Sequence, residues 1–218
     1  LAMRVAPTPA RNRSGAVLRQ MREGFEYVRK KRVVAALLAM LSITGVFGGA
    51  YNALLPAYAE GSLRGGAQTL GWLMGAEGVG AIIGLVYLAG RDGVAGLGRV
   101  VVSCAIALGL ALVALEGVPN VWIAMPVLAV IGMAMILQYS AANTLIQSSV
   151  DEDKLGRVMS LYALSVFAGA PIGALVEGSL ANVIGSVHTF ALAGIGCVTC
   201  ALIFRGSLTA ATDLTGSR

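Results

Sequence analysis

Long stretches without a charged residue constrain this chain of 218 residues more than any other feature. No Asp, Glu, Lys or Arg occurs at 33–59 or at 117–150. A helix needs about 20 mostly apolar residues to cross the hydrocarbon core of a bilayer. Only 12% of the residues are charged, whereas a soluble domain has about 25%. The sequence therefore excludes an ordinary water-soluble enzyme and predicts a membrane protein.

The remaining apolar stretches complete a set of six predicted spans. The longest stretch is 158–204, where Glu177 and His188 are the only acidic, basic or histidine residues. Turn residues at 182–186 divide it into two spans. The ten-residue alternating strands of a membrane barrel are absent from the sequence. We predict an all-α polytopic membrane protein with helices at 33–55, 69–89, 99–118, 121–148, 158–181 and 188–204.

Basic residues predict how these spans are oriented. With six spans, all of the 16 Lys and Arg residues except Arg64 fall on one side. Short loops rich in Lys and Arg stay in the cytoplasm. Both termini are therefore predicted to be cytoplasmic, and the net charge of +5 is a sign of topology rather than of a nucleic-acid partner.

The residues outside the spans form two further predicted regions. At 1–32, apolar residues recur at helical spacing between basic ones, which indicates an amphipathic helix on the membrane surface or, alternatively, a solvated linker. The stretch 205–218 is expected to be a cytoplasmic tail. A basic start without methionine suits the middle of a longer protein, so we expect the chain to be a fragment.

Three sequence runs resemble the second half of a major facilitator superfamily transporter. They are REGFEYVRKKRVV at 22–34, LLPAYA at 54–59 and ANTLIQSSVDEDKLGRVMSLY at 142–162. They are similar to the exporter branch that includes the enterobactin exporter and the transmembrane secretion effectors. The resemblance implies twelve spans in two halves, an N-terminal six-helix half as a partner, and a bacterial plasma (inner) membrane location.

The same resemblance draws attention to the predicted cytoplasmic loops. Asp151 stands where relatives commonly have proline, and Arg157 is the one arginine kept from their arginine-glycine-arginine pattern. Arg91 and Asp92 lie in the loop where the second half carries a degenerate copy of the superfamily's cytoplasmic motif, with anchoring as the alternative role. Pro171 permits a bend within a span, for packing or for conformational change.

Glu77 and Glu177 are the only acidic residues inside the predicted spans. A charged side chain at a helix centre costs about 2.5–3.5 kcal/mol on insertion scales. Such a carboxyl is a candidate for proton coupling, or for a structural hydrogen bond between helices. Glycines recur at four-residue spacing beside both glutamates, so each is expected to face protein rather than lipid.

A polar stripe marks the fourth predicted span. Tyr139, Asn143 and Gln147 are spaced by four, and Gln138 lies beside them. Lipid cannot satisfy such groups, so they are expected to line a substrate cavity, together with Tyr51 and Asn52 of the first span, or to form hydrogen bonds between helices.

These features favour the C-terminal half of a secondary active transporter, which we expect to be a proton-coupled exporter of small hydrophobic molecules or siderophores. The alternatives are a non-transporting or partner-dependent half-protein, and a uniporter or sodium-coupled transporter. The sequence has no motif for ATP binding, for a catalytic serine or for a zinc site. We therefore expect no enzyme activity, no cofactor, no metal and no ATP or nucleic-acid partner, but a lipid bilayer and a small-molecule substrate.

Overall fold

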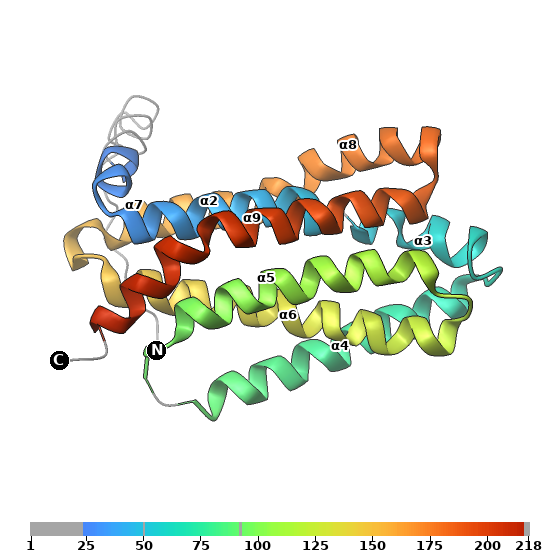
Figure 1. Ribbon diagram of the computed structural model, residues 1–218, viewed down its shortest axis with the longest axis horizontal. Coiled ribbons are helices and arrows are strands. Elements are labelled where there is room, and N and C mark those ends of the chain that lie inside the picture. The colour runs from blue at the N-terminus through green and yellow to red at the C-terminus, as the bar shows by residue number, and fades with distance from the viewer. Residues whose placement is uncertain (1–23, 50, 92, 216–218) are drawn as a thin grey trace, which may run out of the picture.

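Six long apolar helices make up this fold. The computed structural model describes residues 24–49, 51–91 and 93–215, and all the regular structure in these ranges is helical. Six of the helical segments are long and apolar enough to cross a membrane. The helices run roughly along one axis of the molecule (Figure 1). The prediction of an all-α protein with six candidate spans is confirmed.

The first span consists of two helices. Helix α2 covers Arg32–Gly48 and α3 covers Tyr51–Gly61. The two follow one another closely enough to count as one candidate span that reaches residue 61, beyond the predicted end at 55. The chain stays apolar up to Glu60, and Pro56 is tolerated inside α3. A proline removes only one intrahelical hydrogen bond and favours a bend.

The next three spans are less interrupted. Helix α4 covers Ala67–Ala89, α5 covers Leu97–Ala114 and ends in a short 3₁₀ turn, Leu115–Gly117, and α6 covers Val121–Ser149. The side chain of Asn120 caps α6 by accepting a hydrogen bond of 3.1 Å from the N–H of Ile123. This cap satisfies one of the free N–H groups of the first helical turn.

The fifth span begins earlier than predicted and is also broken. Helix α7 covers Glu152–Phe167 and α8 covers Gly169–Ile184, so the helix starts at Glu152 rather than at 158. A run without charges detects only the part of a helix that lies in lipid. Acidic residues stabilise the first turn of a helix, so the helix can begin before the apolar run. Pro171 lies in the first turn of α8, where its missing N–H leaves no intrahelical bond unmade.

The last helix continues well beyond its predicted apolar stretch. Helix α9 covers Ser186–Thr215 and so runs past residue 204. Gly185, between α8 and α9, has a φ of +87°, a left-handed conformation that costs glycine little. The division of the chain into a loop region, a bundle and a tail stays a prediction.

Glycines bring the helices together in three places. Helices α4 and α6, α5 and α9, and α2 and α8 approach closely, because a Cβ on a glycine of each pair would collide with the facing backbone. The glycines concerned are Gly80 and Gly132, Gly109 and Gly194, and Gly45 and Gly169. In lipid the hydrophobic effect does not drive helices together, so such close approaches supply much of the attraction through van der Waals contact.

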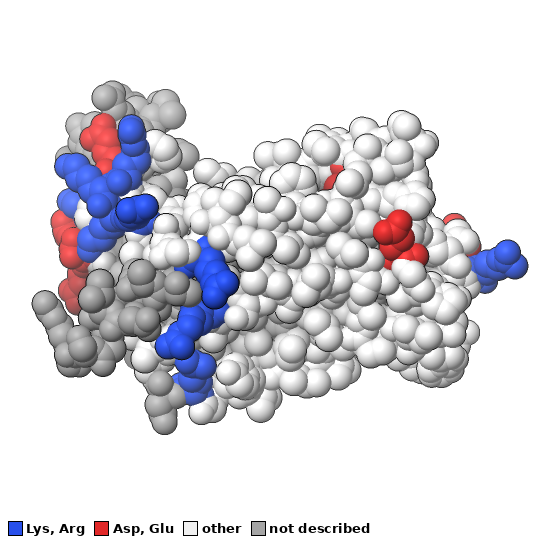
Figure 2. Space-filling model, in the orientation of Figure 1, with Lys and Arg blue, Asp and Glu red and all other residues white. Residues whose placement is uncertain are grey.

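Charged side chains gather at one end of the bundle. Figure 2 shows Lys and Arg concentrated at that end and a broad middle band with very little charged surface. It also shows a few acidic side chains and an isolated basic side chain toward the far end. The α3–α4 connection, which carries Arg64, lies at that far end (Figure 1). Residues 24–30 are helical and lie at the basic end, with Val28 buried. The earlier part of the predicted surface helix lies outside the described residues.

Candidate transport site

The predicted polar stripe forms one face of α6, and a tyrosine of α7 joins it. The amide of Gln147 donates a hydrogen bond to the Asn143 carbonyl oxygen one turn away. Tyr162 donates to the backbone carbonyl of Tyr139 over 3.1 Å. Asn143 and Gln147 are exposed or partly so. Sequence reasoning missed Tyr162, although it is a polar residue within an apolar span, because the stripe was sought on a single helix.

Gln138 makes a hydrogen bond between two helices, which is one of the two roles that the sequence left open. Its side chain is fully buried and donates a hydrogen bond of 3.0 Å to the hydroxyl of Thr44 on α2. The Thr44 hydroxyl in turn donates to the carbonyl of Met40 over 2.9 Å. Gln138 therefore links α6 to α2 and corresponds to the alternative of a hydrogen bond between helices rather than to cavity lining.

Glu77 lies close to Tyr51, where α3, α4 and α6 meet. The Tyr51 side chain is fully buried, and its hydroxyl makes no hydrogen bond of regular geometry with any described residue. The Glu77 carboxyl lies within electrostatic range of this hydroxyl. The backbone of Glu77 is pressed against Gly132 of α6. Asn52 follows on the exposed side of α3.

Glu177 is the more deeply buried of the two membrane carboxyls. Only 4% of its surface is exposed, and neither carboxyl oxygen has a hydrogen-bond partner among the residues described. It lines a cavity of about 70 Å³ between α2, α8 and α9, together with Phe47 and Thr189. That volume is larger than a water molecule occupies in the liquid, about 30 Å³. As the spacing predicted, Gly169 and Gly173 share its buried face.

Asp151 connects two segments at the basic end of the bundle. Its carboxylate accepts a hydrogen bond of 2.7 Å from the Tyr27 hydroxyl and lies 3.5 Å from the Lys31 ammonium. Lys31 also donates to the carbonyl of Ser149 over 2.7 Å. The Tyr27 hydrogen bond, followed by the charge of Lys31, lowers the pKa of Asp151. The Tyr27 contact and the Asp151 charge likewise raise the pKa of Lys31.

The other residues that were predicted to act in the loops or in bending lie on separate elements: after α4, on α7 and on α8. The Arg91 guanidinium donates a hydrogen bond of 2.8 Å to the carbonyl of Ala95. Arg157 lies in the second turn of α7, close to Gly24. Pro171 is exposed on α8, and Asp92 lies outside the described residues. Within the described ranges, no group of three or more His, Cys, Asp or Glu side chains is placed to hold a metal ion.

This arrangement of six apolar spans, two of them divided into two helices, carries a polar face and two membrane carboxyls. It agrees with a sequence relationship that covers almost the whole chain. Residues 2–215 match the transmembrane secretion effector family. The chain belongs to this family. No solved structure matches the chain significantly.

A curated relative gives the transmembrane secretion effector family a functional context. The chain is 24% identical over 176 residues to the multidrug efflux pump Tap of Mycolicibacterium fortuitum, a match that covers 80% of this chain and 42% of Tap. The chain thus spans less than half the length of that relative. Family membership and the six apolar helices indicate a multi-pass membrane protein of a transporter family, a class distinct from enzymes.

Proposed function

We propose that this chain is the C-terminal half of a proton-coupled exporter of small hydrophobic molecules, such as drugs or siderophores. The observation that carries the proposal is Glu177, a carboxyl closed inside the bundle with both oxygens unpaired among the described residues. An ionised carboxylate in such surroundings is strongly disfavoured unless it is paired. The closed arrangement therefore suits the protonated side chain.

The surroundings of Glu177 allow for its deprotonation in a second conformation. Helix α8 is separated from α7 by the break at Ala168, and it packs on α2 through Gly169 and Gly45. A glycine contact and a helix break leave room for α8 to tilt or slide. In this proposal, such a movement opens the cavity to water, where the carboxylate is solvated and releases its proton.

Glu77 and the polar face of α6 support the proposed substrate path. Tyr139, Asn143 and Tyr162 offer hydrogen-bonding groups without formal charge, and Glu77 lies nearby on α4 beside Tyr51. Uncharged donors and acceptors among apolar side chains suit small molecules that are largely hydrophobic. A substrate that approaches Glu77 would displace water and favour one protonation state of that carboxyl, which couples the two binding events.

The proposal includes a second six-helix half and a location in the bacterial inner membrane with both termini in the cytoplasm. Helices α4 and α8 direct large apolar side chains outward, for example Val86 and Leu175 at 67% and 75% exposure. Such surfaces are covered by lipid or by another membrane helix. The match covers 80% of this chain but 42% of Tap, a multidrug efflux pump, and the remaining length of Tap agrees with a second half.

The test is transport in everted membrane vesicles that contain the protein expressed from its complete reading frame. Ethidium is the probe, and an imposed proton gradient is the energy source. We expect Glu177→Gln to reduce gradient-driven uptake to that of vesicles without the protein, because glutamine cannot exchange a proton. Glu60→Gln is the matched control, since Glu60 is exposed at the end of α3, and it should transport normally.

Each other outcome contradicts part of the proposal. Uptake that persists in Glu177→Gln and still follows the proton gradient would remove Glu177 from the coupling, and the same measurement on Glu77→Gln would then show whether Glu77 carries it. Uptake that follows a sodium gradient, or no gradient, would show a sodium-coupled transporter or a uniporter. A folded protein without uptake of ethidium or of a ferric siderophore would favour a non-transporting role.

A further inference from the structure

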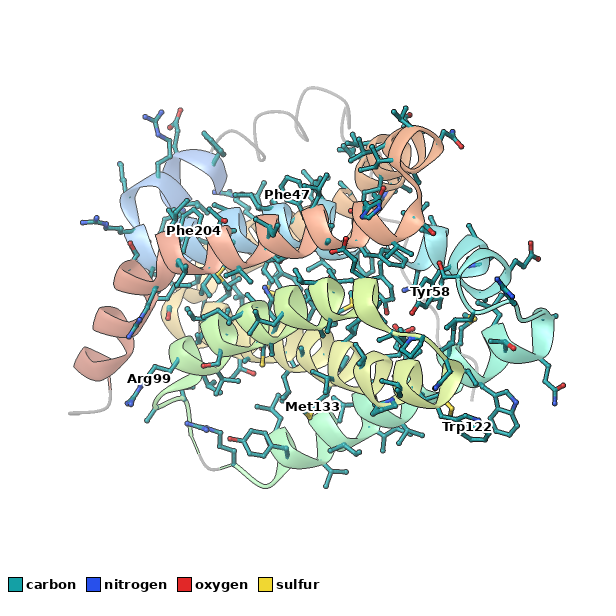
Figure 3. All side chains as sticks on the ribbon, turned by 45° about the vertical axis from the view of Figure 1, so that its right-hand side comes forward. Phe47, Tyr58, Arg99, Trp122, Met133 and Phe204 are labelled. Carbon is teal, nitrogen blue, oxygen red and sulfur yellow. The ribbon has the colours of Figure 1, made fainter. Side chains whose placement is uncertain are left out.

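A second feature, separate from the proposed transport site, lies at the basic end between α4 and α5. The two helices diverge there (Figure 1), and α6 forms the floor of an open groove of about 700 Å³. Its lining combines arginines with apolar side chains: Tyr87, Arg91, Arg99, Val100, Cys104, Met133 and Leu137. Figure 3 shows Arg99 at the start of α5 and Met133 on α6, facing α4.

Arg91 is fixed in this groove with part of its guanidinium unsatisfied. Its Nη2 donates to the carbonyl of Ala95 over 2.8 Å, and Nη1 lies 3.4 Å from the Tyr87 hydroxyl. Its Nε is buried and has no partner among the described residues. Gly96, with a φ of +73°, passes so close that a Cβ there would lie 2.9 Å from Nη2. The loop therefore holds the guanidinium in place at the groove.

The start of α5 adds further positive potential to the groove. Gly96 precedes the helix without any side-chain cap, and Arg99 lies in the first turn. A helix N-terminus carries about half a positive charge, which attracts anions. Two arginines and a helix N-terminus at one end of a groove form a site for a phosphate group.

The rest of the groove is suited to a hydrocarbon chain. Val100 and Cys104 of α5 face Met133 and Leu137 of α6 along the direction that leads into the middle band of the bundle. A free phosphate or a nucleotide would gain nothing from this surface, whereas an amphiphile would bury its chain there. We propose that the groove binds an anionic phospholipid, with its phosphate on Arg91 and Arg99 and an acyl chain along α5 and α6.

The test is native mass spectrometry of the purified protein in detergent with added dioleoylphosphatidylglycerol or dioleoylphosphatidylcholine. We expect the protein to retain phosphatidylglycerol in preference to phosphatidylcholine. Arg91→Gln combined with Arg99→Gln should lower this retention about tenfold or more, because each basic residue near an anionic lipid surface contributes to its attraction. Lys30→Gln, a change of an exposed lysine at the same end, is the matched control.

A second variant separates a shaped site from general attraction to basic charge. Ser103 is exposed in the groove, so Ser103→Trp fills the space without changing the charge and should also reduce phosphatidylglycerol retention. If both variants retain the lipid like the unmodified protein, or if the lysine control loses as much, the site does not exist. Displacement of the lipid by millimolar inorganic phosphate would show that a free anion, not a lipid, is the ligand.

Discussion

At the scale of single residues, Asp151 connects two segments that lie far apart in the chain. The Tyr27 hydroxyl donates to its carboxylate and also accepts a hydrogen bond of 3.3 Å from its backbone N–H. The Lys31 ammonium lies over the Tyr27 ring, with Nζ 5.2 Å from the ring centroid. We call Tyr27, Lys31 and Asp151 the Asp151 latch. It ties the segment before α2 to the connection between α6 and α7, so movement of either segment relative to the other must break it.

The Asp151 latch predicts a dependence on pH. The folded-state pKa of Asp151 is lowered, so its contribution is present above the ordinary pKa and is lost as the pH falls through the lowered value. The pKa of Lys31 is raised, so its contribution is lost only as the pH rises through that raised value. The latch should therefore be intact around neutral pH and open in strong acid or strong base.

Asp151→Asn tests this prediction at constant pH. At pH 7, hydrogen exchange of residues 24–31 should be about twofold faster or more than in the unmodified protein, the scale expected for exposed ion pairs. Glu152→Gln, which changes the neighbouring exposed carboxylate, should leave the exchange unchanged. Equal exchange in Asp151→Asn and the unmodified protein would show that the latch does not hold this segment.

At the scale of elements, the glycine contacts decide which helices pair. Spacings of three and four residues predicted that Gly80 and Gly84 share a face with Glu77, and the structure places both glycines against α6. The contact between α5 and α9 through Gly109 and Gly194 was not predicted. No other glycine lies three or four residues from Gly109 or from Gly194. The partner of each glycine therefore became evident only from the packing.

The seam between α4 and α6 predicts different effects for two glycines of the same helix. A Cβ at Gly80 would collide with the carbonyl of Ala129, whereas a Cβ at Gly78 meets nothing within 4 Å. Gly80→Ala should destabilise the protein by about 1–3 kcal/mol, the usual range for overpacking. Gly78→Ala should be neutral or slightly stabilising, because alanine is the better helix former.

Unfolding of the purified protein by sodium dodecyl sulfate in mixed micelles measures both substitutions. The two variants have the same composition and differ only in the helix face that carries the new methyl group, so the difference between them reports the packing. Similar stability of the two variants would mean that α4 and α6 do not approach as closely as the structure indicates.

At the scale of the whole molecule, the charge distribution predicts the orientation in the membrane. The basic end includes the segment before α2, the α4–α5 connection and the start of α7 (Figures 1 and 2). All of these segments carry Lys or Arg. Basic residues near span ends resist translocation across the membrane. The end with the α3–α4 connection is therefore expected to face the outside.

Gly61 and Gly156 provide a matched test of this orientation. They lie at opposite ends of the bundle, and a Cβ at either position meets nothing within 4 Å. In intact cells, an impermeant maleimide should label Gly61→Cys but label Gly156→Cys only after permeabilisation. The native thiols of Cys104, Cys197 and Cys200 are buried and should contribute little. Reversed labelling would show the opposite orientation.

The sequence by itself determined the six spans, their expected orientation and the two carboxyls within them. A bilayer imposes a fixed thickness and a strong penalty on charge, so these properties depend on the linear order of apolar and charged residues. The same order predicted that Glu77 and Glu177, which have glycines beside them, face protein rather than lipid. It placed the start of α7 too late, because a helix can continue into water where the apolar pattern has ended.

Only the tertiary structure decided what each polar residue contacts. Gln138 reaches Thr44, 94 residues away along the chain, and Tyr27 reaches Asp151, 124 residues away. Residues of α2, α8 and α9 surround Glu177, whose carboxyl oxygens have no hydrogen-bond partner among the described residues. Residues of α4, α5 and α6 together line the groove beside Arg91. Periodicity within one helix identifies a face, but which surface meets that face depends on the packing of all six helices.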